Sequence, residues 1–109
     1  MKRFELWLAN LSPYLGGESS LARPVVIIQT DLLNEVYPST IVCPLTNNFK
    51  DDVEILRVRV ESVHLSHKSD VMVDHIITLD NRRFMKKIGK LTPKQIERLT
   101  YSLKVILDL

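Results

Sequence analysis

Two short apolar segments, each with a polar residue at one end, constrain the fold of this 109-residue chain most strongly. The first reads RPVVII and begins at Arg23, and the second reads TIVCPLT and ends at Thr46. Continuous runs of this kind are typical of strands covered on both faces. Antiparallel pairing with Ile28 opposite Ile41 would place Arg23 opposite Thr46, on the same face with Cβ atoms about 5 Å apart. This register predicts a guanidinium and a hydroxyl side by side, where they would bind a phosphate group.

Further strands are expected around this pair. Apolar alternation predicts them over residues 4–9, 53–60, 71–74, 76–79 and 86–91. The segment that joins the first two strands is too long for a tight hairpin and holds a short helical turn over 31–34. Pro44 requires a sheet edge or an irregularity near the end of its strand, because proline has no N–H for the ladder. The apolar phase changes within residues 53–60, which predicts a bulge near residue 55.

The clearest element is a helix predicted over residues 93–107. Thr92, Pro93 and Gln95 form the pattern of a capping box with proline at the first helical position. Apolar residues then recur at spacings of three and four, at Ile96, Leu99, Leu103 and Ile106. Several strands followed by one helix favour the α+β class, with a strongly bent sheet or a small barrel.

Length and composition indicate one globular domain over residues 1–109. No run of 18 apolar residues is present, and Glu5 interrupts an N-terminus that starts like a signal peptide, so we expect a cytoplasmic protein without a membrane span. Cys43 is the one cysteine and lies within an apolar strand, so it is interpreted as a small buried hydrophobe and not as a catalytic thiol. The net charge of +2 only weakly favours a polyanionic partner.

Several motifs stand in order along nearly the whole chain: ELWL with NLSP, Gly17-Glu18, RPV, DLLN, IVCPLT, SDV and the closing VILDL. Together they resemble the MazF/PemK-type toxins (mRNA interferases) of bacterial toxin–antitoxin systems. The resemblance implies a small SH3-like antiparallel β-barrel with a C-terminal α-helix, assembled as a homodimer. It also implies cleavage of single-stranded RNA at short sequences, without a metal or cofactor. The neighbouring 2′-hydroxyl would be the nucleophile, leaving a cyclic phosphate and a 5′-hydroxyl.

The resemblance assigns the catalytic pair to Arg23 and Thr46, the residues that the register argument aligns. An arginine stays charged and offers planar donors to phosphate oxygens, but it is a poor general base, so the base stays unassigned. Glu18, in the glycine loop, either orients Arg23, accepts a proton or is an ordinary loop acid. His75 titrates near neutral pH and is a candidate base or nucleotide contact, with a surface or structural role as the alternative.

RNA contacts are expected from aromatic and basic side chains. Tyr14, in a long loop, is the best candidate for stacking on a base, and Trp7 and Phe49 are the other aromatic residues considered. The basic candidates are Arg57, Arg59, Arg82, Arg83 and Lys86. His64 and His67 have no further ligand at suitable spacing, so no metal site is predicted.

The chain departs from the family pattern at three places. Ile77 stands where members often have an arginine that helps to bind or cleave RNA, and His75 replaces a glutamine. Phe4 stands where glycine is common, a change interpreted as packing. Two alternatives to a ribonuclease therefore stay open: a toxin of the same fold that binds DNA gyrase, and a nuclease-dead module that binds an antitoxin. The antitoxin implied by the resemblance has a disordered, acidic tail that folds over the RNA groove.

Overall fold

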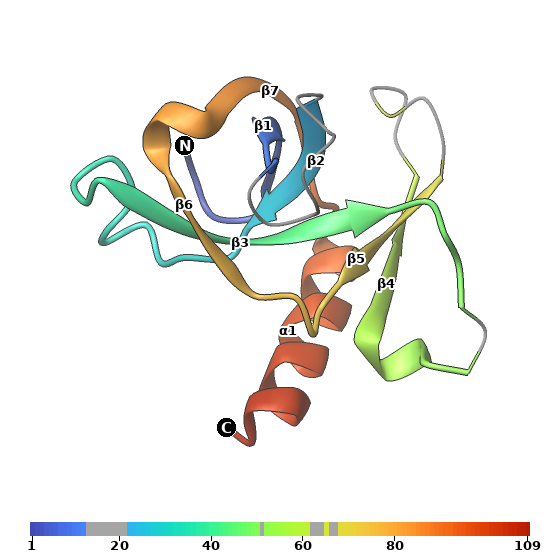
Figure 1. Cartoon of the computed structure of the whole chain (residues 1–109). Coiled ribbons are helices and arrows are strands. Elements are labelled where there is room, and N and C mark those ends of the chain that lie inside the picture. Colours follow the sequence, from blue (N-terminus) through green and yellow to red (C-terminus); the bar gives the residue numbers. More distant parts are fainter. Residues whose placement is uncertain (13–21, 51, 62–64, 66–67) are drawn as a thin grey trace.

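A computed structural model describes residues 1–12, 22–50, 52–61, 65 and 68–109, and shows a curled antiparallel sheet with one helix packed against it (Figure 1). The strands are β1 (Glu5–Asn10), β2 (Ala22–Ile27), β3 (Ser39–Thr46), β4 (Arg57–Val60), β5 (Ser69–Met72), β6 (Ile77–Asp80) and β7 (Phe84–Lys90). The helix α1 covers Pro93–Leu107, and two 3-10 turns cover Glu54–Leu56 (η1) and Asn81–Arg83 (η2). The predicted α+β architecture, a bent antiparallel sheet followed by a C-terminal helix, is confirmed.

The sheet runs in the order β4-β5-β3-β2-β1-β7, and β6 pairs with β3 beside this path. Strands β2 and β3 pair through Val25–Pro44, Val26–Cys43 and Ile27–Val42. This is the register that the sequence predicted, and the N–H of Ile28 continues it by donating to the carbonyl of Ile41 at 3.1 Å.

Pro44 lies where β3 changes its neighbour. Residues Ser39 to Val42 pair with β6, whereas Leu45 and Thr46 pair with β5. Between these two ladders, Pro44 has no partner on that side, which suits a residue without an N–H. The predicted irregularity near the end of the strand is therefore confirmed. It is a fork in the sheet, that is, the point where β3 stops pairing with β6 and starts pairing with β5.

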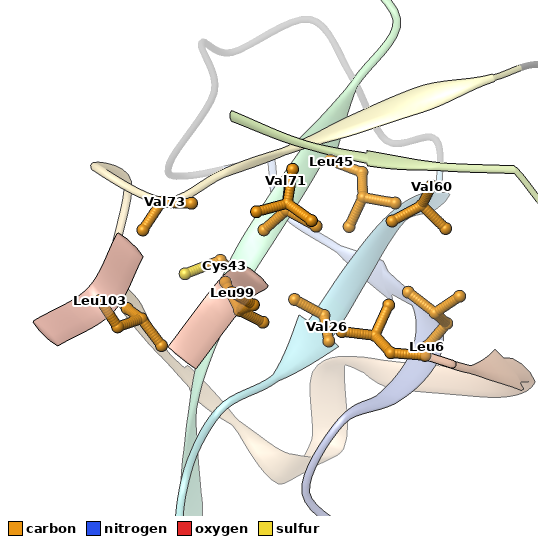
Figure 2. Packing of buried hydrophobic residues seen from close by; sticks show 11 residues of the cluster. Leu6, Val26, Cys43, Leu45, Val60, Val71, Val73, Leu99 and Leu103 are labelled. Atoms are coloured by element: carbon orange, nitrogen blue, oxygen red, sulfur yellow. The ribbon is translucent and has the colours of Figure 1, made fainter. Parts of the chain in front are cut away.

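Alternate residues of the central strands fill two apolar clusters on opposite faces of the sheet. Val26, Cys43 and Leu45 point into one cluster, which α1 covers with Leu99 and Leu103 (Figure 2). Val25, Ile27 and Val42 belong to the other cluster. Since both faces are covered, the continuous apolar character of β2 and β3 is explained.

Residues 53–60 do not form one strand, so the predicted bulge near residue 55 is wrong. The N–H of Leu56 donates to the carbonyl of Val53 at 2.9 Å, closing the 3-10 turn η1 before β4 begins. A 3-10 turn before a strand and a bulge within a strand both shift the alternation of apolar side chains by one residue. The sequence pattern is therefore the same for both.

Phe4 has a backbone φ of 70°, in the left-handed region that favours glycine. Its ring packs against the cluster under α1, as the packing interpretation predicted, and the Arg3 guanidinium lies 4.6 Å from its centroid. The conformation itself is the feature that the sequence interpretation missed. It costs a non-glycine residue roughly 1–2 kcal/mol, which explains why glycine suits this position.

The helix begins as predicted. The N–H of Gln95 donates to Thr92 Oγ1 at 3.2 Å, and the N–H of Thr92 donates to Gln95 Oε1 at 2.8 Å. The helix ends at Asp108, whose left-handed conformation caps its last turn. None of the described helices is long and apolar enough to cross a membrane.

The partly buried carboxylate of Glu5 links β1 to β7. It accepts hydrogen bonds from the N–H of Lys2 at 2.8 Å and from Trp7 Nε1 at 3.0 Å, and its Oε2 lies 2.8 Å from Lys87 Nζ. Burial alone would raise the pKa of this carboxyl, but the hydrogen bonds, that from Lys87 first, outweigh it and lower the pKa to about 2.

We expect the Glu5→Gln variant to lose part of the pH dependence of stability. Because the folded-state pKa is depressed from 4.5 to about 2, the contribution of Glu5 is complete above pH 4.5 and disappears as the pH falls towards 2. That contribution is roughly 2 kcal/mol after allowance for solvent screening. Urea denaturation at several pH values measures it, with Glu97→Gln on the exposed face of α1 as the control. Equal slopes for the wild type and Glu5→Gln between pH 4.5 and 2 would contradict this assignment.

Candidate active site

The candidate pair lies at the end of the β2–β3 ladder. The observed pairing reaches Val25 and Pro44, and the same register, continued by two residues, aligns Arg23 with Thr46. On its other side, Arg23 is the partner of Ala9 in β1. Arg23 is exposed and Thr46 is half-buried, so both side chains are open to a ligand.

The Thr46 hydroxyl is oriented by the backbone that follows it. Its Oγ1 accepts a hydrogen bond from the N–H of Asn48 at 3.1 Å. A hydroxyl that accepts one hydrogen bond still has its own O–H to donate. Thr46 is therefore equipped to donate to an oxygen atom placed between it and Arg23.

Thr46 also begins a row of polar side chains that crosses the smaller part of the sheet. Thr46 is the partner of Asp70 in β5, and Asp70 is the partner of Arg59 in β4. Directly opposed residues share one face of a sheet. Here that face is the one opposite the cluster that contains Val58 and Val71. Hydroxyl, carboxylate and guanidinium thus follow one another on one face.

Arg59 is held firmly in this row. Its Nε donates to Oδ1 of the buried Asp70 at 2.6 Å, and its guanidinium carbon lies 4.1 Å from the centroid of the Phe49 ring. The hydrogen bond to Asp70 raises the pKa of Arg59, so the guanidinium stays charged. An arginine that is already anchored and stacked loses little further side-chain entropy when its remaining N–H groups bind a ligand.

Arg57 and His75 are not members of this row, although Arg57 lies beside it on the same face of β4. Arg57 Nη1 donates to Asp74 Oδ1 at 2.7 Å and to the carbonyl of Leu56 at 2.9 Å, and its side chain is only 10% exposed. His75 lies in the turn that follows β5, with Nε2 3.8 Å from the other oxygen of Asp74. Ile77, where the family resemblance led us to expect an arginine, packs against the second apolar cluster.

The remaining basic candidates lie along η2 and β7. Arg82 is exposed and donates to both oxygens of Asp80, which lowers the pKa of that carboxyl to about 2. Arg83 Nη1 donates to the carbonyl of Asn10 at 3.3 Å, close to the β1 end that pairs with β2. Lys86 is exposed on β7 opposite Leu8.

Several predicted residues lie outside the described part of the chain, namely Tyr14, Glu18, His64 and His67. Among the residues that are described, no group of three or more His, Cys, Asp or Glu side chains is placed to hold a metal ion. Trp7 packs within the fold, since its ring contacts Phe84 edge-on at a centroid distance of 6.0 Å.

Sequence reasoning missed Asp70, Lys50 and Arg98. In the sequence, Asp70 was considered only as part of the SDV motif, and its pairing with Arg59 becomes visible only when the register of β4 and β5 is known. Lys50 and Arg98 are far apart in the sequence, yet both line a pocket with Arg59. The one signal in the sequence is the alternation of arginine and valine over residues 57–60, which indicates a basic outer face on β4.

Comparison with known proteins identifies the family. Residues 2–107 match the family model described as PemK-like, MazF-like toxin of type II toxin–antitoxin system. The chain belongs to this family. It is 32% identical to an endoribonuclease MazF from Staphylococcus saprophyticus, over all of this chain and 92% of that protein. The prediction of an endoribonuclease toxin is thus confirmed at the level of the family.

Solved structures confirm the fold of this MazF-like chain. A MazF crystal structure from Deinococcus radiodurans has a TM-score of 0.81 at 23% identity and covers all of this chain and 97% of its own. A MazE–MazF crystal structure from the same organism has a TM-score of 0.79 at 20% identity, over all of this chain and 96% of its own. The predicted MazF-type barrel with a C-terminal helix is therefore confirmed.

Cys43 is excluded as a nucleophile by its surroundings. It is fully buried, and burial first, with the nearby Asp74 charge second, raises the pKa of its thiol to about 12. A thiol that stays protonated at neutral pH neither attacks phosphorus nor reacts with disulfide reagents.

We expect Cys43 to resist labelling by a thiol reagent in the native protein and to react at once in denaturant. Cys43→Ala, which keeps a small apolar side chain in the strand, should leave RNA cleavage within about twofold of the wild type, because the thiol takes no part in the reaction. Rapid labelling of the native protein, or a large loss of cleavage in a folded Cys43→Ala variant, would contradict this assignment.

Proposed function

We propose that this chain is a sequence-specific, metal-independent endoribonuclease toxin that cleaves single-stranded RNA. The observation that carries the proposal is the β2–β3 register, which aligns Arg23 with Thr46 at an open strand end of a MazF-like fold. We infer that residues 1–109 act as one domain in the cytoplasm, where messenger RNA is the substrate.

In the proposed reaction, the 2′-oxygen of the nucleotide before the scissile bond attacks phosphorus. The bond from phosphorus to the 5′-oxygen breaks, and that oxygen leaves with the electron pair and takes up a proton. The products are a 2′,3′-cyclic phosphate and a 5′-hydroxyl. Negative charge grows on the non-bridging oxygens, where Arg23 donates two parallel N–H groups and Thr46 donates its O–H.

The group that removes the proton from the 2′-hydroxyl is left unassigned. Arginine side chains are not deprotonated in proteins, so Arg23 has no free lone pair with which to accept a proton and is a poor general base. Glu18 is a candidate as a loop carboxylate close in sequence to Arg23. His75 is the weaker candidate, since it lies beyond β5 beside Asp74.

The protein partners follow from the family. We propose that the chain forms a homodimer and binds an antitoxin whose disordered acidic tail covers the RNA groove. The MazE–MazF complex among its structural relatives supports an antitoxin as a partner. Charge attraction would guide such a tail to a basic groove, and the tail would order on binding.

Two other functions remain as alternatives. A nuclease-dead module is favoured by Ile77, which packs into an apolar cluster where relatives carry an arginine. A gyrase-binding toxin of the same fold is the second alternative, and gyrase inhibition without RNA cleavage would favour it.

We expect Arg23→Ala to lower kcat/KM for RNA cleavage by at least about 100-fold, the usual effect of removing one preorganised donor to a developing oxyanion. Thr46→Val, which keeps the shape and removes the hydroxyl, should lower it by about 10-fold or more, and Thr46→Ser should restore most of the activity. Cleavage of a defined transcript pool in the presence of EDTA, with end-group analysis of the products, measures both rate and chemistry.

The matched control is Lys104→Ala, which removes an exposed cation near the end of α1. Thermal unfolding midpoints show whether each variant is folded. Full activity of folded Arg23→Ala and Thr46→Val proteins would end the case for this catalytic pair, and complete loss of cutting in EDTA would end the case for metal independence.

We also expect an acidic peptide with interspersed Leu and Trp residues to compete with RNA for the protein. Both ligands would occupy the same basic groove, so raising the peptide concentration should release a labelled RNA, as measured by fluorescence anisotropy. A peptide with Lys in place of each Asp and Glu is the control and should not compete. Simultaneous binding of RNA and acidic peptide without mutual weakening would exclude a shared groove.

A further inference from the structure

Beside the row of polar side chains, the structure contains a pocket of about 370 Å³. It is an open pocket bordered by Lys50 before η1, by η1 itself, by β4 and β5, and by the N-terminal half of α1. Its lining is polar and consists of Lys50, Glu54, Arg57, Arg59, Asp70 and Arg98. A pocket of this size accepts a group as large as a nucleotide.

Two of the four cations in this pocket are already neutralised. Arg59 is paired with Asp70 at 2.6 Å, and Arg57 is paired with Asp74 at 2.7 Å. No ion pair among the described residues involves Lys50, Arg98 or Glu54. In the described part of the chain, the unpaired charges of the pocket are therefore the two exposed cations Lys50 and Arg98 and the one exposed carboxylate Glu54. Their net positive charge favours binding of an anion.

Arg59 presents hydrogen-bond donors to the pocket in a fixed orientation. Its Nε donates to Asp70 and one face of its guanidinium stacks on the Phe49 ring. No hydrogen bond from its Nη groups to another described residue is present, so these groups are the donors that we assign to a ligand. Planar N–H donors held in place suit phosphate oxygens in particular.

The pocket is connected to the proposed active site through Asp70. Asp70 is the cross-strand partner of Thr46 on one side and of Arg59 on the other. Two inter-strand spacings separate the Thr46 and Arg59 backbones, which is about 10 Å. This spacing brings the pocket close to the RNA strand whose scissile phosphate lies at Thr46 in the proposed reaction.

We propose that this pocket, through Lys50, Arg59 and Arg98, binds a backbone phosphate of the RNA other than the one that is cleaved. The inference rests on the proposed function for the identity of the polyanion. It assigns a binding role to Arg98, a helix residue remote from Arg23 in the sequence, and it assigns an opposing role to Glu54, whose charge repels the same phosphate.

The test measures the salt dependence of binding to a pool of short 2′-O-methyl RNAs of mixed sequence, which have no free 2′-hydroxyl and so are not cleaved. We expect Lys50→Gln and Arg98→Gln each to weaken binding by roughly fivefold and to reduce the slope of log K against log salt by about 0.7, the value for one phosphate contact on a single strand. Arg98→Lys should retain the slope. Glu54→Gln should have the opposite effect and strengthen binding.

The matched control is Lys94→Gln, which removes the same charge one helical turn before Arg98 but does not line the pocket. It should bind like the wild type. Wild-type affinity and slope in both Arg98→Gln and Glu54→Gln would overturn the proposal, as would equal weakening by Lys94→Gln, which would indicate a diffuse effect of net charge.

Cleavage of unmodified RNA, measured in parallel, separates the two proposals. If the wild type cuts RNA and the pocket variants bind like the wild type, the phosphate pocket alone is wrong. If the wild type cuts no RNA but the variants change the affinity and slope in the expected directions, the proposed nuclease is wrong and the phosphate pocket stands.

Discussion

The register between β2 and β3 is the constraint on which the rest of the structure depends. Adjacent residues of these strands enter different apolar clusters, Val25 and Val42 on one face and Val26 and Cys43 on the other. A slip of one residue would turn every side chain of one strand to the wrong face. The packing that excludes this slip also fixes the relative position of the two polar strand ends, so the apolar core determines the geometry of the candidate active site.

The fork at Pro44 extends this site across the sheet. Because β3 leaves β6 and joins β5 at this point, its last residue, Thr46, pairs with Asp70 of β5 and lies two residues beyond the last β2–β3 pair, Val25–Pro44. One strand end thus connects the end of the β2–β3 ladder, where Arg23 lies, with the anchored Arg59. A β3 paired with β6 along its whole length would have kept Thr46 away from Asp70.

The parts of the structure that were predictable from the sequence depend on local pattern. The helix over Pro93–Leu107 has a capping box and a regular apolar stripe. The two apolar runs predicted a buried strand pair, and the register supposed for it, with Ile28 opposite Ile41, is the one observed. The turn at η1 was not predictable, since a turn and a bulge shift the apolar phase alike. The pairing of Asp70 with Arg59 and the pocket with Arg98 depend on contacts between distant segments, which one sequence does not reveal.

Asp70 and Arg59 also constrain how this surface is able to change over evolutionary time. Asp70 is buried, whereas the Arg59 side chain is 42% exposed, so loss of Arg59 leaves a buried carboxylate without its partner, while loss of Asp70 leaves a guanidinium that water solvates. Substitution of Arg59 alone is therefore disfavoured, and viable changes at Arg59 also replace Asp70. Homologous toxins should consequently differ here in pairs, so that one family with a common barrel presents alternative, internally matched surfaces beside the same strand end.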